Sequence, residues 1–554
     1  MSMGWQGEDG QRKSVVAPTS CIITAFSPVL DTRQTWTPEL RTDQSEPTVL
    51  VFFDLAAGKQ RLGGSSLAQV FKQIGAESPN VEDAQVLKSF FNACQQIRLD
   101  HPDLVLAYHD RSDGGLLTTI VEMCFAGRVG AEIMVDAFKK DDDAIAALFN
   151  EELGAVFQVR ESDAAQLSKS FIHAGFPAAD IHLIGRVSDR SSQAISIASG
   201  GSLLWSATRG DLQKAWSETS YKMQALRDSP KGALEEFENI TDESNTGLFY
   251  RLTFDPAQNV ADPFLERLTS LNDRPKVAIL REQGVNGHIE MAYAFNVAGF
   301  AAVDVHMSDI ISGKVSLSNF KGLAACGGFS YGDVLGAGNG WAKSILLHEG
   351  ARREFTSFFG DRKDTFALAV CNGCQLFSQL KEVIPGAEDW PLFKQNLSGR
   401  FEGRVSLVEI DSPSNDSVFL RGMHGSILPV AVAHGEGRAT FVNGELCLSL
   451  PALSPLTDSP STSTGASPSS SSVCVRYVDP QGARTERYPY NPNGSPEGVT
   501  GVSALGGRVL ALMPHPERVI LSRSNSWTPP VDSKTWAGRG PWARIFENAR
   551  EWVA

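Results

Sequence analysis

Residues 365–380 read TFALAVCNGCQLFSQL, and this stretch decides the fold of the C-terminal half. Residues 365–370 form a short apolar run typical of a buried strand, and the apolar residues of 376–384 recur at helical spacing until Pro385. Cys371 therefore lies at a sharp strand-to-helix turn. Such a turn holds a side chain clear of the sheet, beside free N–H groups that favour the thiolate, the reactive form of cysteine.

Three interpretations of this stretch are open from its residues alone. Cys371 is a nucleophile, or a buried structural cysteine, or one member of a redox or metal-binding pair with Cys374, because the two form a C-x-x-C. The eight cysteines include no second close pair that would complete a four-thiolate zinc site.

A second stretch favours the nucleophile. Residues 508–513, RVLALM, predict another strand, which is followed by Pro514-His515-Pro516-Glu517. A residue before proline is held extended, and side chains two apart in an extended segment share a face. His515 and Glu517 then form an imidazole base with an orienting carboxylate, the partners that a nucleophilic Cys371 needs. A surface turn is the alternative for this tripeptide taken alone.

The order of elements after residue 276 predicts the architecture around these residues. Strands alternate with helices there, which is typical of a largely parallel sheet with helices on both faces and an active site at the carboxyl ends of its strands. Gly327-Gly328 follows one predicted strand, and the N–H groups of Gly328 and Asn372 would suit an oxyanion hole. An ordinary turn at Gly327-Gly328 is the other interpretation.

Composition excludes several classes of protein. The formal net charge of −14 argues against a nucleic-acid binder, whose contact face is basic. No apolar stretch is long enough for a membrane span, the N-terminus lacks the layout of a signal peptide, and eight scattered cysteines in 554 residues suit a reducing compartment. We therefore expect a cytoplasmic protein without nucleic-acid or membrane partners.

The chain divides into three parts and one insertion. We expect an α+β domain over 1–210, a polar linker over 211–275, and an α/β domain over 276–554. Residues 451–472 are dominated by Ser, Thr and Pro and predict a disordered surface insertion.

A loop of the first domain carries further candidate residues. His109-Asp-Arg-Ser-Asp-Gly-Gly115 follows a predicted strand and precedes a predicted helix. Its carboxylates, hydroxyl and glycines suit Mg²⁺ and a nucleotide phosphate, because hard cations choose oxygen ligands. For Asp113 we favour the alternative role of helix cap.

Together these motifs are similar to a known family. A C-x-G-x-Q elbow with a distal H-P-E resembles the class I (triad) glutamine amidotransferases, which hydrolyse glutamine and pass the ammonia to a partner site. The wider pattern resembles the large, single-chain phosphoribosylformylglycinamidine synthases, and the loop at residues 109–115 resembles their aminoimidazole-ribonucleotide-synthetase-like repeats. The matching segments are 280–286, 325–338, 371–375, 434–438, 491–495 and 513–518.

The resemblance implies an ATP-dependent ligase of purine biosynthesis. Such an enzyme converts formylglycinamide ribonucleotide, ATP and glutamine to formylglycinamidine ribonucleotide, ADP, phosphate and glutamate, with Mg²⁺ as a cofactor. It implies Cys371 as nucleophile, His515 as base and Glu517 as its orienting group. It also implies Asp110 as a magnesium ligand and Ser112 as a nucleotide contact.

The sequence also departs from this family. Ala369 replaces the glycine usual two residues before the nucleophile. The resemblance places the chain in the C-terminal part of such an enzyme, with Met1 at an internal position and most of the ATP site outside the chain, so we expect glutaminase activity alone. Two rivals are a thiol-disulfide oxidoreductase that uses Cys371 and Cys374, and a non-catalytic scaffold fragment.

Overall fold

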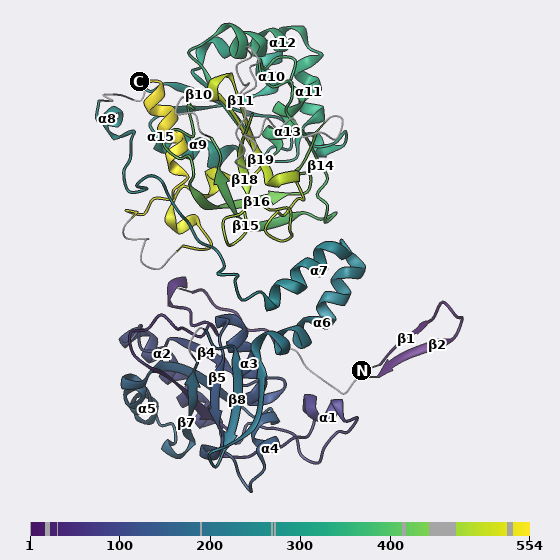
Figure 1. Ribbon diagram of the computed structural model, residues 1–554, viewed down its shortest axis with the longest axis vertical. Coiled ribbons are helices and arrows are strands. Elements are labelled where there is room, and N and C mark those ends of the chain that lie inside the picture. Colours follow the sequence, from purple (N-terminus) through teal and green to yellow (C-terminus); the bar gives the residue numbers. More distant parts are fainter. Residues whose placement is uncertain are drawn as a thin grey trace, which may run out of the picture. The chain divides into compact units, whose positions relative to one another are not determined.

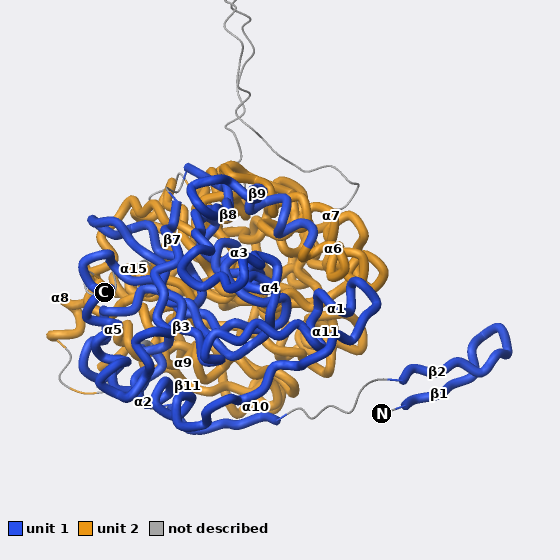
Figure 2. Tube along the Cα trace, turned by 90° about the horizontal axis from the view of Figure 1, so that it is seen from below, with its two compact units in different colours: residues 1–215 blue, residues 216–554 orange. Residues whose placement is uncertain are grey.

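The computed structural model forms two compact units, residues 1–215 and 216–554, which are coloured separately in Figure 2. It describes residues 2–16, 23–29, 31–188, 191–267, 270, 273–412, 417–441, 472–528 and 536–554. The expected disordered insertion at 451–472 lies, except for Ser472, outside the described residues.

The first unit is built on a seven-stranded sheet with the order β4-β6-β3-β7-β5-β8-β9. Its strands are β3 (Thr48–Asp54), β4 (Ala107–Asp110), β5 (Ala131–Met134), β6 (Gly154–Arg160), β7 (Ile181–Val187), β8 (Ala194–Ser199) and β9 (Ser202–Thr208). Its helices are α1 (Ser66–Val70), α2 (Ala84–Asp100), α3 (Gly115–Gly127), α4 (Ala144–Phe149) and α5 (Ala164–His173). A separate hairpin joins β1 (Ser2–Gln6) to β2 (Arg12–Val16).

The central strand β3 shows why this sheet is covered on both faces. Successive side chains of a strand point to opposite faces, and those of β3 enter two different cores. Leu50 and Phe52 pack with residues of α3 and α4, whereas Val51 and Phe53 pack with residues of α2 and α5. The predicted α+β domain is therefore present, and its last strand ends at Thr208.

The segment predicted as a linker, 211–275, is more structured than expected. It contains most of α6 (Arg209–Arg227), all of α7 (Pro230–Glu238) and the short α8 (Asp262–Leu265). Tyr250 and Phe254 pack against the core of the second unit, and Arg251 forms a β-bridge with Ile427. The apolar and aromatic run 248–254 explains this, because it buries side chains that a solvated linker would expose.

The second unit contains a nine-stranded mixed sheet with the order β11-β10-β12-β13-β20-β19-β18-β15-β16. Its strands are β10 (Lys276–Arg281), β11 (Ala301–His306), β12 (Gly322–Ala325), β13 (Phe366–Val370), β15 (Glu402–Ile410), β16 (Ile427–His434), β18 (Val473–Tyr477), β19 (Val499–Ala504) and β20 (Val509–Leu512). A small separate sheet pairs β14 (Leu392–Lys394) with β17 (Arg438–Thr440).

Helices flank this sheet, as expected for the α/β class (Figure 1). They are α9 (His288–Val297), α10 (Met307–Ile311), α11 (Asn339–Leu346), α12 (Glu349–Thr356), α13 (Asn372–Gln379) and α15 (Ala543–Trp552). Phe295 of α9 meets Phe546 of α15 edge to face, with ring centroids 5.0 Å apart. Among the described helices, none has both the length and the apolar character needed to cross a membrane.

The sheet is parallel only where the predicted site lies. Strands β11, β10, β12, β13 and β20 pair in parallel, and the remaining pairs, from β20 to β16, are antiparallel. The expected largely parallel sheet therefore describes this part alone. β12, β13 and β20 are neighbours, so their carboxyl ends meet at one edge, and the three key loops leave from there.

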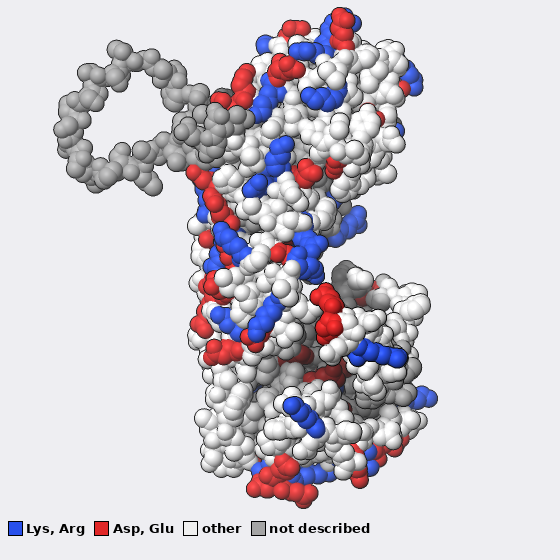
Figure 3. Space-filling view, turned by 90° about the vertical axis from the view of Figure 1, so that its right-hand side faces the viewer, with Lys and Arg blue, Asp and Glu red and all other residues white. Residues whose placement is uncertain are grey.

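On the face shown in Figure 3, Lys and Arg side chains are interspersed with Asp and Glu side chains.

Gly373 offers a test of how tightly α13 packs on the sheet. A methyl group at this position would collide with the carbonyl oxygen of Ala325 in β12. Glycine to alanine in a helix ordinarily stabilises by about 1 kcal/mol. We expect Gly373→Ala to lower the free energy of unfolding instead, by about 1–3 kcal/mol, because the core is overpacked.

Urea unfolding followed by tryptophan fluorescence measures this difference. Gly360→Ala is the matched control, because a methyl group there would meet only Pro385 Cγ, at 4.0 Å. A Gly373→Ala variant as stable as the wild type would contradict the close contact between α13 and β12.

Candidate active site

Cys371 occupies the turn between β13 and α13, as predicted. Its backbone angles are φ 54° and ψ −110°, an uncommon conformation for a residue other than glycine and one that stores strain at functional sites. α13 ends at Gln379, so the helix is shorter than the apolar spacing suggested. Leu380 and Ile384 continue in turns and are buried all the same. The Cys371 side chain is only 6% exposed.

The side chains of His515 and Glu517 are in contact, but the backbone that joins them does not have the predicted extended conformation. His515 Nδ1 lies 2.7 Å from Glu517 Oε1, and the two residues are 1% and 2% exposed. The segment is not extended throughout, because Pro516–Val519 forms a 3-10 helix. The carboxylate is therefore brought to the imidazole by a turn rather than by a shared strand face. The backbone N–H of His515 donates to the carbonyl of Ala431 at 2.8 Å, which fixes this turn on β16.

His515 and Cys371 converge on Gly327. A methyl group on Gly327 would lie 2.7 Å from His515 Cε1 and 3.3 Å from Cys371 Cβ. His515 Nε2 is buried and has no hydrogen-bond partner within the described residues. Because Nδ1 is engaged by Glu517, Nε2 is the nitrogen available to a thiol or to a substrate.

The electrostatics of His515 follow from these neighbours. Burial lowers the pKa of His515, but the charges of Glu517 and Cys371, together with the hydrogen bond to Glu517, outweigh burial and raise the pKa to about 10. The imidazole is therefore protonated near neutral pH, held between a carboxylate and the sulfur.

The N–H groups of Gly328 and Asn372 lie beside this pair. Gly328 has φ 146°, and a methyl group there would lie 2.6 Å from the Cα of Val285, so only glycine fits. Asn372 is the first residue of α13, where backbone N–H groups lack helical partners. Within the described chain neither N–H donates a hydrogen bond, so both are available to an oxyanion.

A cavity of about 340 Å³ opens on Cys371, and the sequence reasoning missed several of its residues. The lining residues that it did not assign are Asn286, Phe329, Asp333, Ala337, Gln375, Phe401, Ala433, His434, Gly435, Glu436 and Arg518. Most of them lie in the six segments that carry the family resemblance, which is the signal that could have found them. Phe401 and Ala433 lie outside those segments.

Two carboxylates in this cavity interact. Burial raises the pKa of Asp333 to about 6, with a further rise from the charge of Glu436, while a hydrogen bond from Asn372 opposes the shift. Glu436 is held in place by the backbone N–H of Ala337 at 3.2 Å. Because the two negative charges repel each other, this part of the cavity favours a bound cation.

His434 is a second buried histidine in the cavity. The Oδ1 atom of Asn493 accepts from Ser495, so its Nδ2 donates to His434 Nε2 at 3.2 Å and the imidazole proton lies on Nδ1. Burial, together with the charge of His515, lowers the pKa of His434 to about 3, so it is neutral near pH 7. In the part of the chain that is described, Nδ1 has no partner, which leaves one N–H donor for a substrate.

Cys374 contrasts with Cys371. It is fully buried within α13, and burial raises the pKa of its thiol well above the ordinary value. Both cysteines are free thiols.

The predicted nucleotide and metal residues lie in the first unit. Asp110 ends β4 and accepts a hydrogen bond from the hydroxyl of Tyr108, and the Ser112 carbonyl accepts from Gly115 N at 2.9 Å. The expected capping role of Asp113 is wrong. Gly114, with φ 82°, occupies the cap position and has no side-chain cap.

The N–H of Gly114 bonds to the side chain of Glu151 instead, at 2.7 Å. Among the described residues no three His, Cys, Asp or Glu side chains are grouped to hold a metal ion. Asp110 is therefore not grouped there with two further side chains of these types, and waters and nucleotide phosphates would have to supply most ligands of a Mg²⁺ ion that it bound.

Two family models match the chain. The CobB/CobQ-like glutamine amidotransferase domain matches residues 274–452 and 459–553, and the C-terminal domain of AIR synthase related proteins matches residues 54–197. All of this chain aligns with phosphoribosylformylglycinamidine synthase of Schizosaccharomyces pombe at 51% identity, over 40% of that protein. The corresponding protein of Saccharomyces cerevisiae is 48% identical over all of this chain and 39% of its own length.

The chain belongs to the phosphoribosylformylglycinamidine synthase family. It spans about two fifths of the length of these curated relatives. A solved structure, PurLQS from Thermotoga maritima, aligns with 51% of this chain and all of its own chain, at 20% identity and a TM-score of 0.35.

The different burial of the two elbow cysteines predicts different reactivity. Iodoacetamide at pH 7.5 should alkylate Cys371 at least tenfold faster than Cys374, because a thiolate forms readily only where the thiol is not fully buried. Peptide mapping by mass spectrometry after timed quenching gives both rates in one sample. Equal rates, or faster alkylation of Cys374, would contradict the arrangement of the elbow.

Proposed function

We propose that residues 276–554 hydrolyse glutamine to glutamate and ammonia, and that they do so as part of a phosphoribosylformylglycinamidine synthase. The observation that carries the proposal is the convergence of Cys371, His515 and Glu517 at the carboxyl ends of two neighbouring parallel strands. Cys371 and His515 also line the cavity there. A nucleophile, an acid–base group and an orienting carboxylate are the parts that acyl transfer requires.

The first half of the reaction forms a thioester. Cys371 Sγ attacks the carboxamide carbon of glutamine, and the carbonyl oxygen becomes an oxyanion. The N–H groups of Gly328 and Asn372 stabilise that oxyanion, and each such donor contributes about 3 kcal/mol. His515 Nε2 gives its proton to the departing nitrogen, so that ammonia leaves and the C–N bond is replaced by a C–S bond.

The second half regenerates the enzyme. His515, now neutral, takes a proton from a water molecule that attacks the thioester carbon. The C–S bond breaks, glutamate leaves, and the proton remains on His515 opposite the Cys371 thiolate. Glu517 holds the imidazole orientation and its positive charge throughout, through the 2.7 Å contact with Nδ1.

Recognition of glutamine uses the rest of the cavity. Asp333 and Glu436 are suited to the α-ammonium group, because a cation relieves the repulsion between their two carboxylates. Arg518 lines the same cavity and pairs with Glu290 through Nε at 2.9 Å. Its terminal nitrogens are suited to the α-carboxylate.

The larger reaction would use the ammonia on formylglycinamide ribonucleotide, with ATP. The first unit, which matches an AIR synthase related domain, is the part of this chain suited to contribute to that site. Ser112 would contact the nucleotide there, and Asp110 would bind Mg²⁺ only together with residues beyond this chain. We propose that this reaction takes place in the cytoplasm.

The roles proposed for Cys371, His515 and Glu517 predict how strongly different substitutions lower glutaminase activity. His515→Ala should lower kcat for glutamine hydrolysis by roughly 10³-fold or more, because proton transfer is lost. Glu517→Gln should cost less, because a base remains although its orientation is weakened. Cys371→Ser should abolish turnover, whereas Cys374→Ser should keep most of it.

Steady-state release of glutamate and ammonia measures all four variants. If Glu517→Gln proved more damaging than His515→Ala, the two roles would have to be exchanged. A wild-type protein without glutaminase activity would remove the proposal as a whole.

Asp333 predicts how glutamine binding depends on pH. Its pKa of about 6 lies above the ordinary value, so the carboxylate is charged above pH 6 and becomes neutral as the pH falls through 6. Affinity for glutamine should therefore be full at pH 7.5 and fall as the pH drops from 7 to 5. Asp333→Asn should bind more weakly at pH 7.5 and lose most of this dependence.

Calorimetric titration of glutamine into Cys371→Ala protein separates binding from turnover. Glu382→Gln serves as a control carboxylate, because Glu382 pairs with Arg352 and lies outside the cavity lining. Unchanged pH dependence in Asp333→Asn would exclude Asp333 as the titrating group.

A further inference from the structure

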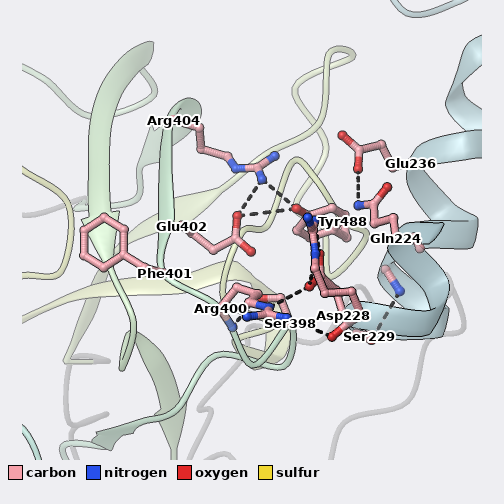
Figure 4. A pocket seen from close by; sticks show the side chains of 13 residues that line it. Gln224, Asp228, Ser229, Glu236, Ser398, Arg400, Phe401, Glu402, Arg404 and Tyr488 are labelled. Atoms are coloured by element: carbon pink, nitrogen blue, oxygen red, sulfur yellow. Dashed lines mark hydrogen bonds and ion pairs between the residues drawn. The ribbon is translucent and has the colours of Figure 1, made fainter. Parts of the chain in front are cut away.

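A second cavity of the same unit, of about 580 Å³, lies against the glutamine cavity. It is lined by the end of α6, the start of α7, the segment 398–404 and Tyr488 (Figure 4). Phe401 is the residue that lines both cavities. Its side chain is therefore a wall between them.

Phe401 is not fixed by core packing. Its side chain is 55% exposed, and its ring approaches that of Phe329 with centroids 6.5 Å apart. Phe329 directly follows Gly328 of the proposed oxyanion hole. The position of Phe401 therefore depends on its own backbone and on the hydrogen bonds that hold the neighbouring residues of the chain. Two residues, Asn396 and Arg400, make such bonds, and each is called an anchor below.

One anchor is Asn396, which is 3% exposed. Its Nδ2 donates to the carbonyls of Arg400 and His434 at 2.9 and 2.8 Å, and its Oδ1 accepts from Gly437 N at 2.9 Å. These bonds join the segment before Phe401 to the segment 434–437, of which residues 434–436 line the glutamine cavity.

The other anchor is Arg400, the residue immediately before Phe401. Arg400 Nε donates to Asp228 Oδ1 at 2.6 Å, and Nη2 donates to the carbonyl of Arg227 at 3.0 Å. Hydrogen bonds from Arg227 and Arg400 lower the pKa of Asp228 to about 2, so it carries its charge at any pH of interest. Figure 4 shows Arg400 turned to Asp228, while the ring of Phe401 extends away from the helices.

We propose that the Arg400–Asp228 pair positions Phe401 and thereby sets the access of reagents and of glutamine to Cys371. Arg400 and Asp228 are positioning residues, since neither lines the cavity that contains Cys371. With the pair broken, the segment 398–401 keeps its Asn396 anchor but loses its tie to the end of α6. Phe401 then samples positions in which the wall is open. The part of the proposal that concerns glutamine rests on the proposed function.

Alkylation of Cys371 tests the wall without any need for turnover. Arg400→Gln and Asp228→Asn should each raise the rate of Cys371 alkylation by iodoacetamide by about 3–10-fold, and Phe401→Ala should raise it at least as much. Arg400→Lys, which can keep the ion pair, should lie close to the wild type. Cys374 in the same peptide map reports general loosening and should not change.

Glutamine kinetics add a second readout. Breaking the pair should raise KM for glutamine at least threefold with kcat within twofold of the wild type, because a wall of the site is loosened while the triad is intact. The double variant should resemble Arg400→Gln, which by itself removes the bonds to both Asp228 and the Arg227 carbonyl. Melting temperatures within about 2 °C of the wild type exclude a general loss of structure.

Arg352→Gln is the matched control. Arg352 pairs with Glu382, and its side chain is 49% exposed, against 50% for Arg400, but it lines neither cavity. In this variant, the rate of Cys371 alkylation and the kinetics of glutamine hydrolysis should equal those of the wild type.

Two results would overturn the inference. One is wild-type alkylation in Phe401→Ala, which would mean that Phe401 is no wall. The other is faster alkylation in Phe401→Ala but not in Arg400→Gln or Asp228→Asn, which would mean that the pair does not position it. Failure of the proposed function looks different, because the wild type would then lack glutaminase activity while the alkylation pattern persisted.

Discussion

The parallel pairing of β12, β13 and β20 is the constraint on which the site depends. Parallel neighbours end at the same edge of a sheet, so the loops that leave them are forced together although they are far apart in the chain. Gly327-Gly328, Cys371 and the turn to Glu517 follow these three strands in turn. The close contact of Gly373 with β12 then fixes where α13 begins, and with it the first free N–H of that helix.

Burial strengthens the electrostatic interactions among the residues of this site. His515 is 1% exposed and Glu517 2%, so their interaction acts in a medium of low dielectric, where charges interact far more strongly than in water. Burial alone would make His515 neutral, and its two charged partners reverse that outcome. His434, equally buried but with only an amide as its partner, has its pKa lowered instead. Two histidines in one site thus differ in charge because their neighbours differ.

The segment between the two predicted domains also belongs to the functional unit. It was expected to be a linker, yet its aromatic run 248–254 packs against the core, and the end of α6 holds Arg400. A polar composition averaged over 211–275 conceals both features. The hydrogen bond between Arg400 and Asp228 thus joins residues that are 172 positions apart in the sequence.

The sequence by itself determined the elements that carry local signals. The apolar run before Cys371, the H-P-E after a later strand and the alternation of strands and helices were sufficient to predict the α/β class, the turn at Cys371 and the proximity of Cys371, His515 and Glu517, because each signal depends on a few neighbouring residues. The catalytic roles of these three residues stay a prediction. Asp333, His434, Glu436 and Phe401 carry no such local signal. Only the tertiary structure decided that they share one cavity, that a turn rather than a strand joins His515 to Glu517, and that half of the sheet is antiparallel. The physical reason is that a pKa, a cavity wall or a strand's direction is set by whichever distant groups the fold brings within a few ångströms.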